Sequence, residues 1–194
     1  MIFKSYILEQ NIQTIHKYKI FLFYGENQGL QKEFKENLKI IKDVEILNLF
    51  QDEIIKNKDI LINEIKNKFL FNKKKLIFIN EANDKILEIL EKITESIQEE
   101  KIFIFSSILE KKSKLRSYFE KSKIFGITAC YKDNEITIKK IILNKLNGYQ
   151  GLTPQIINLI IQNTGLDRNK INNEIEKIKS CFQNKIIDEN KIGL

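Results

Sequence analysis

The residues whose types and spacing most suggest chemistry form the run GENQG, from Gly25 to Gly29. An apolar run typical of a buried strand (20–24) precedes it, and a segment with helical periodicity follows. Strand, glycine turn and helix form the layout of a loop that binds nucleotide phosphates. Such a loop also needs a Lys for the phosphates and a Ser or Thr for Mg²⁺. Leu30 and Gln31 follow Gly29 instead, so the sequence predicts a degenerate phosphate loop without a bound nucleotide.

Polar residues follow two other apolar runs. Asn80 and Glu81 come after the predicted strand 76–79, and Ser106 and Ser107 come after 102–105. ATP hydrolysis by this layout needs acidic residues that hold Mg²⁺ and orient water. A single carboxylate beside an asparagine does not supply them, so we interpret these residues as polar strand ends and predict no catalytic residue.

Metal-ligating residues are sparse. His16 is the one histidine, and the two cysteines, Cys130 and Cys181, form no CxxC motif. The spacing predicts no metal site, no Cys–His nucleophile pair and no cofactor. We interpret both thiols as core residues of a protein in a reducing cytoplasm.

The segment Phe69, Leu70 and Phe71 lies between a predicted helix and the lysine run 73–75. Two interpretations remain open for it. The three large apolar residues either close the core at a helix-to-strand corner or form an exposed anchor for a partner's pocket.

The densest basic cluster comprises Lys111, Lys112, Lys114 and Arg116. Ser113 is expected to cap the helix that begins there. This cluster is either a solvated helix start or a contact to the phosphates of DNA, and the sequence does not separate the two.

Composition bounds the function more loosely. The formal net charge of +7 suggests nucleic-acid binding, but all except two of the 33 basic residues are lysines spread over the whole chain. We therefore interpret most of the excess as solvated surface. No apolar run approaches the roughly 18 residues that span a bilayer, and residues 1–13 lack a signal segment, so we expect a cytoplasmic protein without a membrane partner.

The elements that must position these residues alternate between strand and helix through residue 131. Continuous apolar strands that alternate with amphipathic helices predict an α/β fold, a parallel sheet flanked by helices. The predicted strands are 20–24, 44–50, 76–79, 102–105 and 127–131, and the predicted helices are 5–17, 30–41, 52–68, 86–97 and 113–121.

The last third of the chain predicts helices only. One helix spans 135–146, and a second begins after Thr153 with Pro154 in its first turn and ends before Gly165. A third spans 167–181. We expect an α/β domain over residues 1–132 and a small all-helical domain over residues 133–194.

In their order along the chain, four segments resemble the delta subunit of the bacterial DNA polymerase III clamp loader. They are FLFYGENQGLQKE, the FLF corner before KKKLIFINEAN, IFIFSSILEKKSKLRSYFEK and GLDRNKINNEIEKIKSC. The resemblance implies an AAA+-like (P-loop NTPase-like) fold that does not bind ATP, followed by a lid-like helical domain. Arg168 falls where ATP-binding relatives carry a nucleotide-sensing arginine, and we expect it to be structural here.

The resemblance also implies a function in DNA replication, the opening of the sliding clamp (beta) for loading onto primed DNA. Leu70 and Phe71 would form the clamp-binding wedge, and Phe69 adjoins it. The implied partners are the gamma/tau and delta-prime subunits, within a DNA-directed DNA polymerase III holoenzyme whose nucleotidyltransferase activity lies elsewhere in the complex. Family members continue into a collar domain, so the chain is expected to be either a fragment or a truncated protein.

Two alternatives belong to other classes. The chain could be an independent P-loop-like NTPase that uses the cleft at Gly25–Gly29, or a nucleic-acid-binding protein. The first requires saturable, Mg²⁺-dependent nucleotide binding, and the second requires a steeply salt-dependent affinity for DNA without any clamp.

Overall fold

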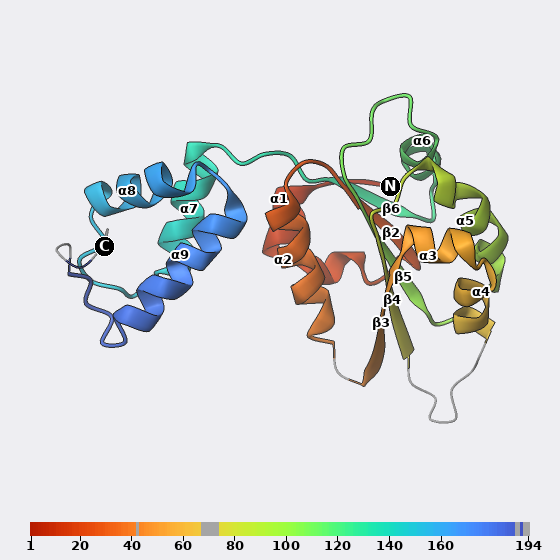
Figure 1. The fold of residues 1–194 in the computed structure, drawn as a ribbon, viewed down its shortest axis with the longest axis horizontal. Coiled ribbons are helices and arrows are strands. Elements are labelled where there is room, and N and C mark those ends of the chain that lie inside the picture. The colour runs from red at the N-terminus through yellow and green to blue at the C-terminus, as the bar shows by residue number, and fades with distance from the viewer. Residues whose placement is uncertain (42, 67–73, 189–190, 192–194) are drawn as a thin grey trace. The chain divides into compact units, whose positions relative to one another are not determined.

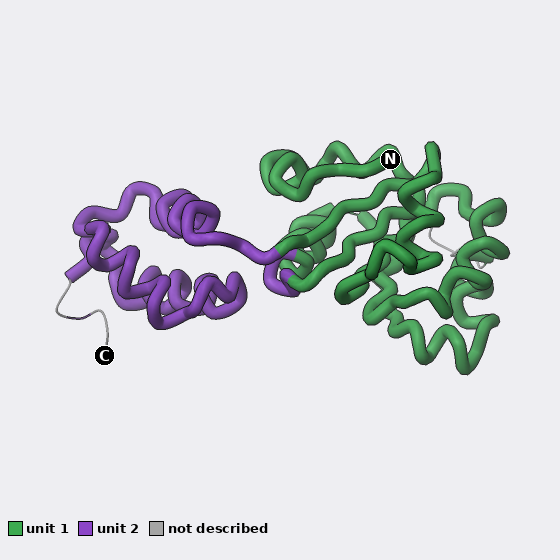
Figure 2. The backbone as a smooth tube through the Cα atoms, turned by 90° about the horizontal axis from the view of Figure 1, so that it is seen from above, with its two compact units in different colours: residues 1–26, 31–131 green, residues 27–30, 132–194 purple. Residues whose placement is uncertain are grey.

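The computed structural model describes residues 1–41, 43–66, 74–188 and 191. The chain separates into two compact units (Figure 2). The first comprises Met1–Glu26 and Gln31–Tyr131, and the second comprises Asn27–Leu30 and Lys132–Leu194. Each unit has its own hydrophobic core.

A six-stranded sheet forms the centre of the first unit (Figure 1), with the strand order β1-β6-β2-β5-β4-β3. Every neighbouring pair of strands is parallel, which confirms the predicted parallel sheet. All five residues of the central strand β2 are buried. The strands are β1 (Ile2–Lys4), β2 (Ile20–Tyr24), β3 (Val44–Phe50), β4 (Lys74–Asn80), β5 (Lys101–Ser106) and β6 (Gly126–Ala129).

The two faces of this sheet carry different apolar side chains, because successive residues of a strand point to opposite sides. The face covered by α3 to α6 is mainly aliphatic, and the face covered by α1 and α2 is mainly phenylalanine (Figure 1). Phe23 of β2 stacks on Phe105 of β5 with ring centroids 5.0 Å apart and contacts Phe34 of α2 at 5.3 Å. The helices are α1 (Ser5–Gln10), α2 (Gln28–Lys39), α3 (Gln51–Lys56), α4 (Asp59–Lys66), α5 (Leu87–Ile93) and α6 (Lys114–Lys121).

Local predictions differ from the structure at β1 and in three helices. The strand β1 was not predicted, because three residues carry too little periodicity to distinguish a strand from a helix start. The predicted helix 5–17 is divided into α1 and the 3₁₀ helix η1 (Ile12–Ile15). The predicted helix 52–68 is divided at Asn57, whose side chain accepts a hydrogen bond from the backbone N–H of Asp59 and so competes with helical pairing; its last two residues lie outside the described part.

The 3₁₀ helices η2 (Asp84–Ile86) and η3 (Thr94–Ser96) flank α5, so the helix predicted over 86–97 is also shorter than expected. Helix boundaries of this kind are the least reliable part of a prediction from periodicity.

The second unit contains the three predicted helices, α7 (Glu135–Lys145), α8 (Pro154–Thr164) and α9 (Arg168–Cys181). Thr153 caps α8 by accepting a hydrogen bond from the N–H of Ile156, and Gly165 ends it in the left-handed conformation at φ 61°. Cys130 is buried as predicted, but the prediction that Cys181 is a core residue is wrong. Cys181 is exposed because it lies off the buried stripe of α9 formed by Ile171, Ile175 and Ile178.

Candidate functional site

The loop that follows β2 begins at Gly25, which has a φ of +136°. A Cβ atom at this position would lie 2.3 Å from the carbonyl oxygen of Cys130, so the backbone there tolerates only glycine. The N–H of Gly25 donates to the carbonyl oxygen of Ser107 at 3.0 Å. The loop thus contacts the segments that follow β5 and β6, the two strands that pair with β2.

Gln31 stands where a functional phosphate loop has its Mg²⁺-binding Ser or Thr, and its side chain is buried. Its amide nitrogen donates to the carbonyl oxygens of Gly25 and Ser106, both at 3.0 Å. A side chain of the protein itself therefore closes this part of the loop, and both donor hydrogens of the amide are used.

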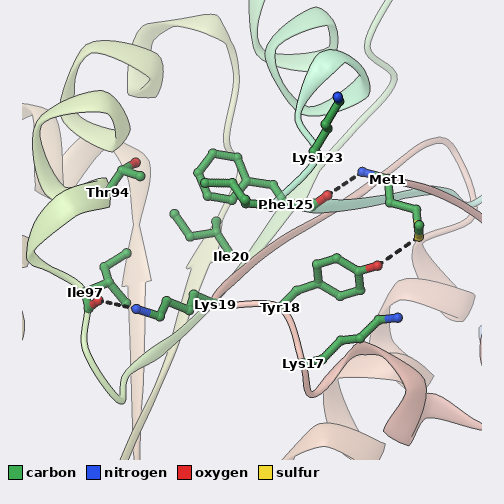
Figure 3. A pocket seen from close by; sticks show the side chains of 10 residues that line it. Met1, Lys17, Tyr18, Lys19, Ile20, Thr94, Ile97, Lys123 and Phe125 are labelled. Carbon is green, nitrogen blue, oxygen red and sulfur yellow. Dashed lines mark hydrogen bonds between the residues drawn. The ribbon is translucent and has the colours of Figure 1, made fainter.

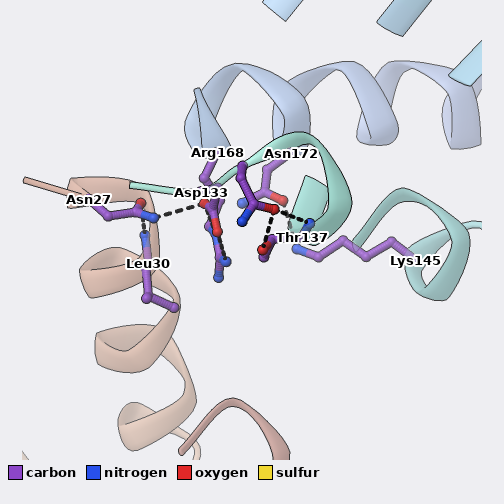
Figure 4. Close-up of polar contacts among 8 residues, drawn as sticks. Asn27, Leu30, Asp133, Thr137, Lys145, Arg168 and Asn172 are labelled. Carbon is purple, nitrogen blue, oxygen red and sulfur yellow. Dashed lines mark hydrogen bonds and ion pairs between the residues drawn. The ribbon is translucent and has the colours of Figure 1, made fainter. Parts of the chain in front are cut away.

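In the second unit, Asn27 uses both ends of its side-chain amide (Figure 4). Its Oδ1 accepts from the N–H of Leu30 at 3.0 Å, and its Nδ2 donates to Asp133 Oδ2 at 2.8 Å. Backbone N–H groups in the first turn of a helix are the donors that hold a phosphate in a working loop. Here one of them is satisfied by Asn27.

Arg168 forms a buried ion pair with Asp133 in the same unit. Its Nε and Nη2 donate to the two carboxylate oxygens at 2.8 and 2.6 Å, and 1% and 5% of the two side chains are exposed. A Cβ atom on Gly29 would lie 2.7 Å from the Cβ of Arg168, so this glycine is needed for close packing. The guanidinium is held by a bidentate carboxylate, which favours the structural interpretation of Arg168.

Of the two polar residues at the end of β4, Asn80 is bonded within the protein and Glu81 is exposed. Asn80 donates to the carbonyl oxygen of Leu49 at 3.0 Å and accepts from Lys35 Nζ at 2.8 Å. Burial lowers the pKa of Lys35, whose ammonium lies 5.3 Å from the centroid of the Phe78 ring. Glu81 is exposed with a φ of 56°, so a lone carboxylate faces solvent where hydrolysis would need an ordered acidic pair.

Ser106 is buried and donates its hydroxyl to the carbonyl oxygen of Ala82 at 2.6 Å. This bond joins the ends of β5 and β4. The serine is therefore part of the framework of the sheet edge, in agreement with its interpretation as a polar strand end.

The basic cluster lies at the start of α6, and its members differ. Lys111, Lys112 and Lys114 are exposed, whereas 19% of the Arg116 side chain is exposed. Arg116 Nε donates to Glu120 at 2.8 Å, and the guanidinium lies 5.2 Å from the centroid of the Tyr24 ring. The three lysines are the members of the cluster that present charge to solvent.

An acidic side chain occupies the amino end of α6. Ser113 caps the helix as predicted and donates its hydroxyl to Asp84 Oδ1 at 2.6 Å. The backbone N–H groups of Leu115 and Lys114 also donate to the Asp84 carboxylate, at 3.0 and 3.1 Å. Burial raises the pKa of Asp84, but these hydrogen bonds outweigh it and the net pKa is lowered. Any phosphate contact at this cluster would therefore rely on lysine ammonium groups.

The corner formed by Phe69, Leu70 and Phe71 lies outside the described residues, and its two interpretations remain predictions. Lys75, which is 4% exposed, connects the two described elements on either side of this corner, α4 and β4, through hydrogen bonds. Its ammonium donates to the Glu64 carboxylate at 2.9 Å and to the Glu64 carbonyl oxygen at 2.7 Å. The last turn of α4 and the start of β4 are thus held together.

Sequence reasoning missed Asn27, Gln31, Asp84 and Asp133 as residues that occupy the loop and the α6 start. Gln31 was noted only because it is not the Ser or Thr that a phosphate loop needs. Asp84 and Asp133 had no signal, since each bonds residues about 30 or more positions away. No group of three or more His, Cys, Asp or Glu side chains that could hold a metal ion occurs among the described residues. Within the same residues, no helix is long and apolar enough to cross a membrane.

The fold is of the AAA+-like class, a parallel sheet flanked by helices and followed by a helical region. The solved DNA clamp loader delta protein (YqeN) of Bacillus subtilis is similar over 94% of this chain and 59% of its own, with a TM-score of 0.63 and 12% identity. A variant of RuvB from Thermotoga maritima is similar over 96% of this chain and 65% of its own, with a TM-score of 0.55 and 13% identity. The chain thus spans less than two thirds of either protein. No family model and no curated protein matches it.

Proposed function

We propose that this chain is a delta-type clamp-loader subunit that binds the sliding clamp and does not hydrolyse ATP. The observation that carries the proposal is the loop after β2, in which Gln31 bonds Gly25 and Ser106 where a nucleotide-binding relative needs a Mg²⁺ ligand. An AAA+-like fold without working nucleotide chemistry acts through its surfaces. The fold similarity to a clamp loader delta protein over 94% of the chain supports that direction.

The clamp-binding surface in this proposal is the apolar pair Leu70 and Phe71, with Phe69 beside it. The pair would enter an apolar pocket on the clamp and favour the open ring by binding it better than the closed one. Residues 1–132 would form the clamp-binding domain and residues 133–194 the lid-like domain. Neighbouring ATPase subunits would control when the clamp-binding surface is exposed, and the other clamp-loader partners would be the gamma/tau and delta-prime subunits.

A second candidate function, direct contact with primed DNA, is favoured by one observation. Lys111, Lys112 and Lys114 are exposed together at the start of α6, although Lys112 also pairs with Glu110 at 3.0 Å. Each lysine that neutralises a phosphate would make the affinity more dependent on salt.

Calorimetric titration against the sliding clamp of the same organism tests the proposal. The parent chain should bind, and the variant Leu70→Ala/Phe71→Ala should lose about 2 kcal/mol or more of binding free energy because anchors dominate such interfaces. A matched control is Ile108→Ala/Ile136→Ala, which removes two apolar side chains that are 64% and 67% exposed elsewhere. This control should bind like the parent.

Equal binding by the parent and the folded Leu70→Ala/Phe71→Ala variant would show that the clamp contact lies elsewhere. No binding by a folded parent would remove the proposal. Saturable, Mg²⁺-dependent binding of ATP to the chain alone would favour the independent NTPase instead.

A further inference from the structure

The first unit contains a pocket of about 590 Å³ at the amino ends of the strands (Figure 3). Its apolar lining includes Ile20, the first residue of β2, and Phe125, which directly precedes β6. Ile97 lines it from the segment before β5. In open α/β sheets, ligands usually bind at the carboxyl ends of the strands, where the degenerate loop lies here. This pocket is therefore separate from the site already described.

The inner surface of the pocket is a fixed part of the core. Ile20, Ile97 and Phe125 are 1%, 3% and 4% exposed, and Tyr18 is 6% exposed. The Tyr18 hydroxyl donates to the sulfur of Met1, which also lines the pocket. A hollow of this volume lies in the range of ligand pockets, about 300–1,000 Å³, and can admit one large apolar side chain.

The rim of the pocket is cationic. Lys17, Lys19 and Lys123 line it and are exposed, and none of the ten lining residues is acidic. Lys19 Nζ donates to the carbonyl oxygen of Ile97 at 2.8 Å, and Lys17 Nζ lies 5.3 Å from the centroid of the Tyr18 ring. Like charges around a low-dielectric hollow raise its positive potential and attract anions.

The arrangement of the charges favours an occupant with more than one negative group. Lys17 and Lys19 precede β2, whereas Lys123 precedes β6. In Figure 3, Lys123 lies above the Tyr18 ring and Lys17 lies below it. Ile124, which is 65% exposed, extends the apolar lining at the rim beside Lys123. A chain with carboxylates on both sides of an apolar anchor matches this pattern better than a ligand with a single charged head.

We propose that this pocket binds a short acidic segment of a partner protein, with one aromatic or aliphatic side chain inserted and carboxylates facing the three lysines. The proposal does not depend on the clamp-loader function. The carboxylates would steer the segment to the rim, and burial of the anchor would supply most of the affinity.

The test is an NMR titration of the ¹⁵N-labelled full chain with three blocked pentapeptides. The first is Asp-Glu-Phe-Glu-Asp, the second has Ser in place of Phe, and the third is Lys-Lys-Phe-Lys-Lys. The first should bind with a dissociation constant below about 1 mM and shift amide signals around Ile20, Ile97 and Phe125. The other two should bind at least about tenfold more weakly, because each lacks either the anchor or the complementary charge.

The variant Lys17→Glu/Lys123→Glu should raise the dissociation constant of the acidic peptide by about five- to tenfold, and its spectrum should remain that of a folded protein. The control Lys32→Glu/Lys56→Glu makes the same change in net charge at exposed lysines that do not line the pocket, and it should bind like the parent. Ile124→Ser tests the apolar rim without reversing a charge, and it should also lower the affinity for the acidic peptide.

Three results would each overturn the proposal. They are no shift with the acidic peptide at millimolar concentration, shifts that map away from the pocket, and equal binding of the acidic and basic peptides. Equal loss of affinity in Lys17→Glu/Lys123→Glu and in its control would also count against it, since only the general charge of the protein would then matter.

Discussion

The two edges of the sheet in the first unit differ in the exposure of their polar side chains, although Lys19 at the amino edge also donates to the carbonyl oxygen of Ile97. At the carboxyl edge, the side chains of Gln31, Asn80 and Ser106 bond groups of the protein itself. At the amino edge, three exposed lysines surround an apolar hollow of about 590 Å³. At the edge where this architecture usually binds a ligand, these side chains are bonded within the protein, and at the opposite edge a pocket is open.

The difference teaches that a strand, glycine turn and helix can form an ordered loop although Lys and Ser/Thr do not follow Gly29. Buried polar groups must be paired, because an unpaired donor or acceptor costs about 1–3 kcal/mol. A phosphate would accept hydrogen bonds from backbone N–H groups, and in the second unit Asn27 Oδ1 accepts from the N–H of Leu30. In the first unit, Gln31 and Ser106 instead donate to carbonyl oxygens, and they make the carboxyl edge a structural element.

The largest expected effect comes from Gly25→Ala. It should lower the free energy of unfolding by about 2–5 kcal/mol, because it combines an unfavourable φ with a Cβ atom 2.3 Å from the Cys130 carbonyl oxygen. Urea denaturation followed by circular dichroism measures this. Gly148→Ala is the control, since Gly148 has a φ of +84° but no atom within 4 Å of a Cβ there, and it should cost about 1 kcal/mol. Equal effects of the two changes would mean that the carboxyl edge is not tightly packed.

An intermediate effect is expected for Gln31→Leu. The change keeps a side chain of similar size but removes the donor to the carbonyl oxygens of Gly25 and Ser106. It should lower the free energy of unfolding by about 1–3 kcal/mol. Gln28→Leu changes an exposed residue of the same helix and should stay within about 0.5 kcal/mol of the parent. If Gln31→Leu is as stable as the parent, the filled loop has no structural role and the contrast between the edges fails.

The smallest effect is expected for Asp84→Asn, which replaces the carboxylate at the start of α6 by a neutral amide. The cost should be about 0.5–1 kcal/mol at neutral pH, near the lower end because Asp84 is exposed. The folded-state pKa of Asp84 is lowered, so its contribution is present above the ordinary aspartate pKa, about 3.9, and is lost as the pH falls through the folded pKa.

Denaturation curves of the parent and Asp84→Asn should therefore converge as the solution is acidified below that value. A difference in stability that stays constant from neutral to acidic pH would contradict this account of Asp84. Asp59→Asn is a suitable comparison, since Asp59 also lies in the first turn of a helix.

Much of the fold was predictable because its signals are local. The five predicted apolar strands, the three helices of the second unit and the Thr153, Pro154 and Gly165 signals were interpreted correctly, whereas three helices of the first unit are divided or shorter than predicted. The missed strand β1 is stabilised by pairing with β6, more than 120 residues away in sequence. The exposed Cys181 was missed because its residue type suggested burial, although the periodicity of α9 excluded it from the core stripe.

The sequence by itself determined the parallel α/β layout and the absence of Lys and Ser/Thr after Gly29, because residue type and short spacing carry both. Only the tertiary structure decided what occupies that edge, since Gln31 meets Ser106 across 75 positions and Asp84 meets Ser113 across 29. The pocket is likewise assembled from the segments that precede β2, β5 and β6. Pairings between distant residues arise when parallel strands bring their ends to one edge, and no local pattern encodes them.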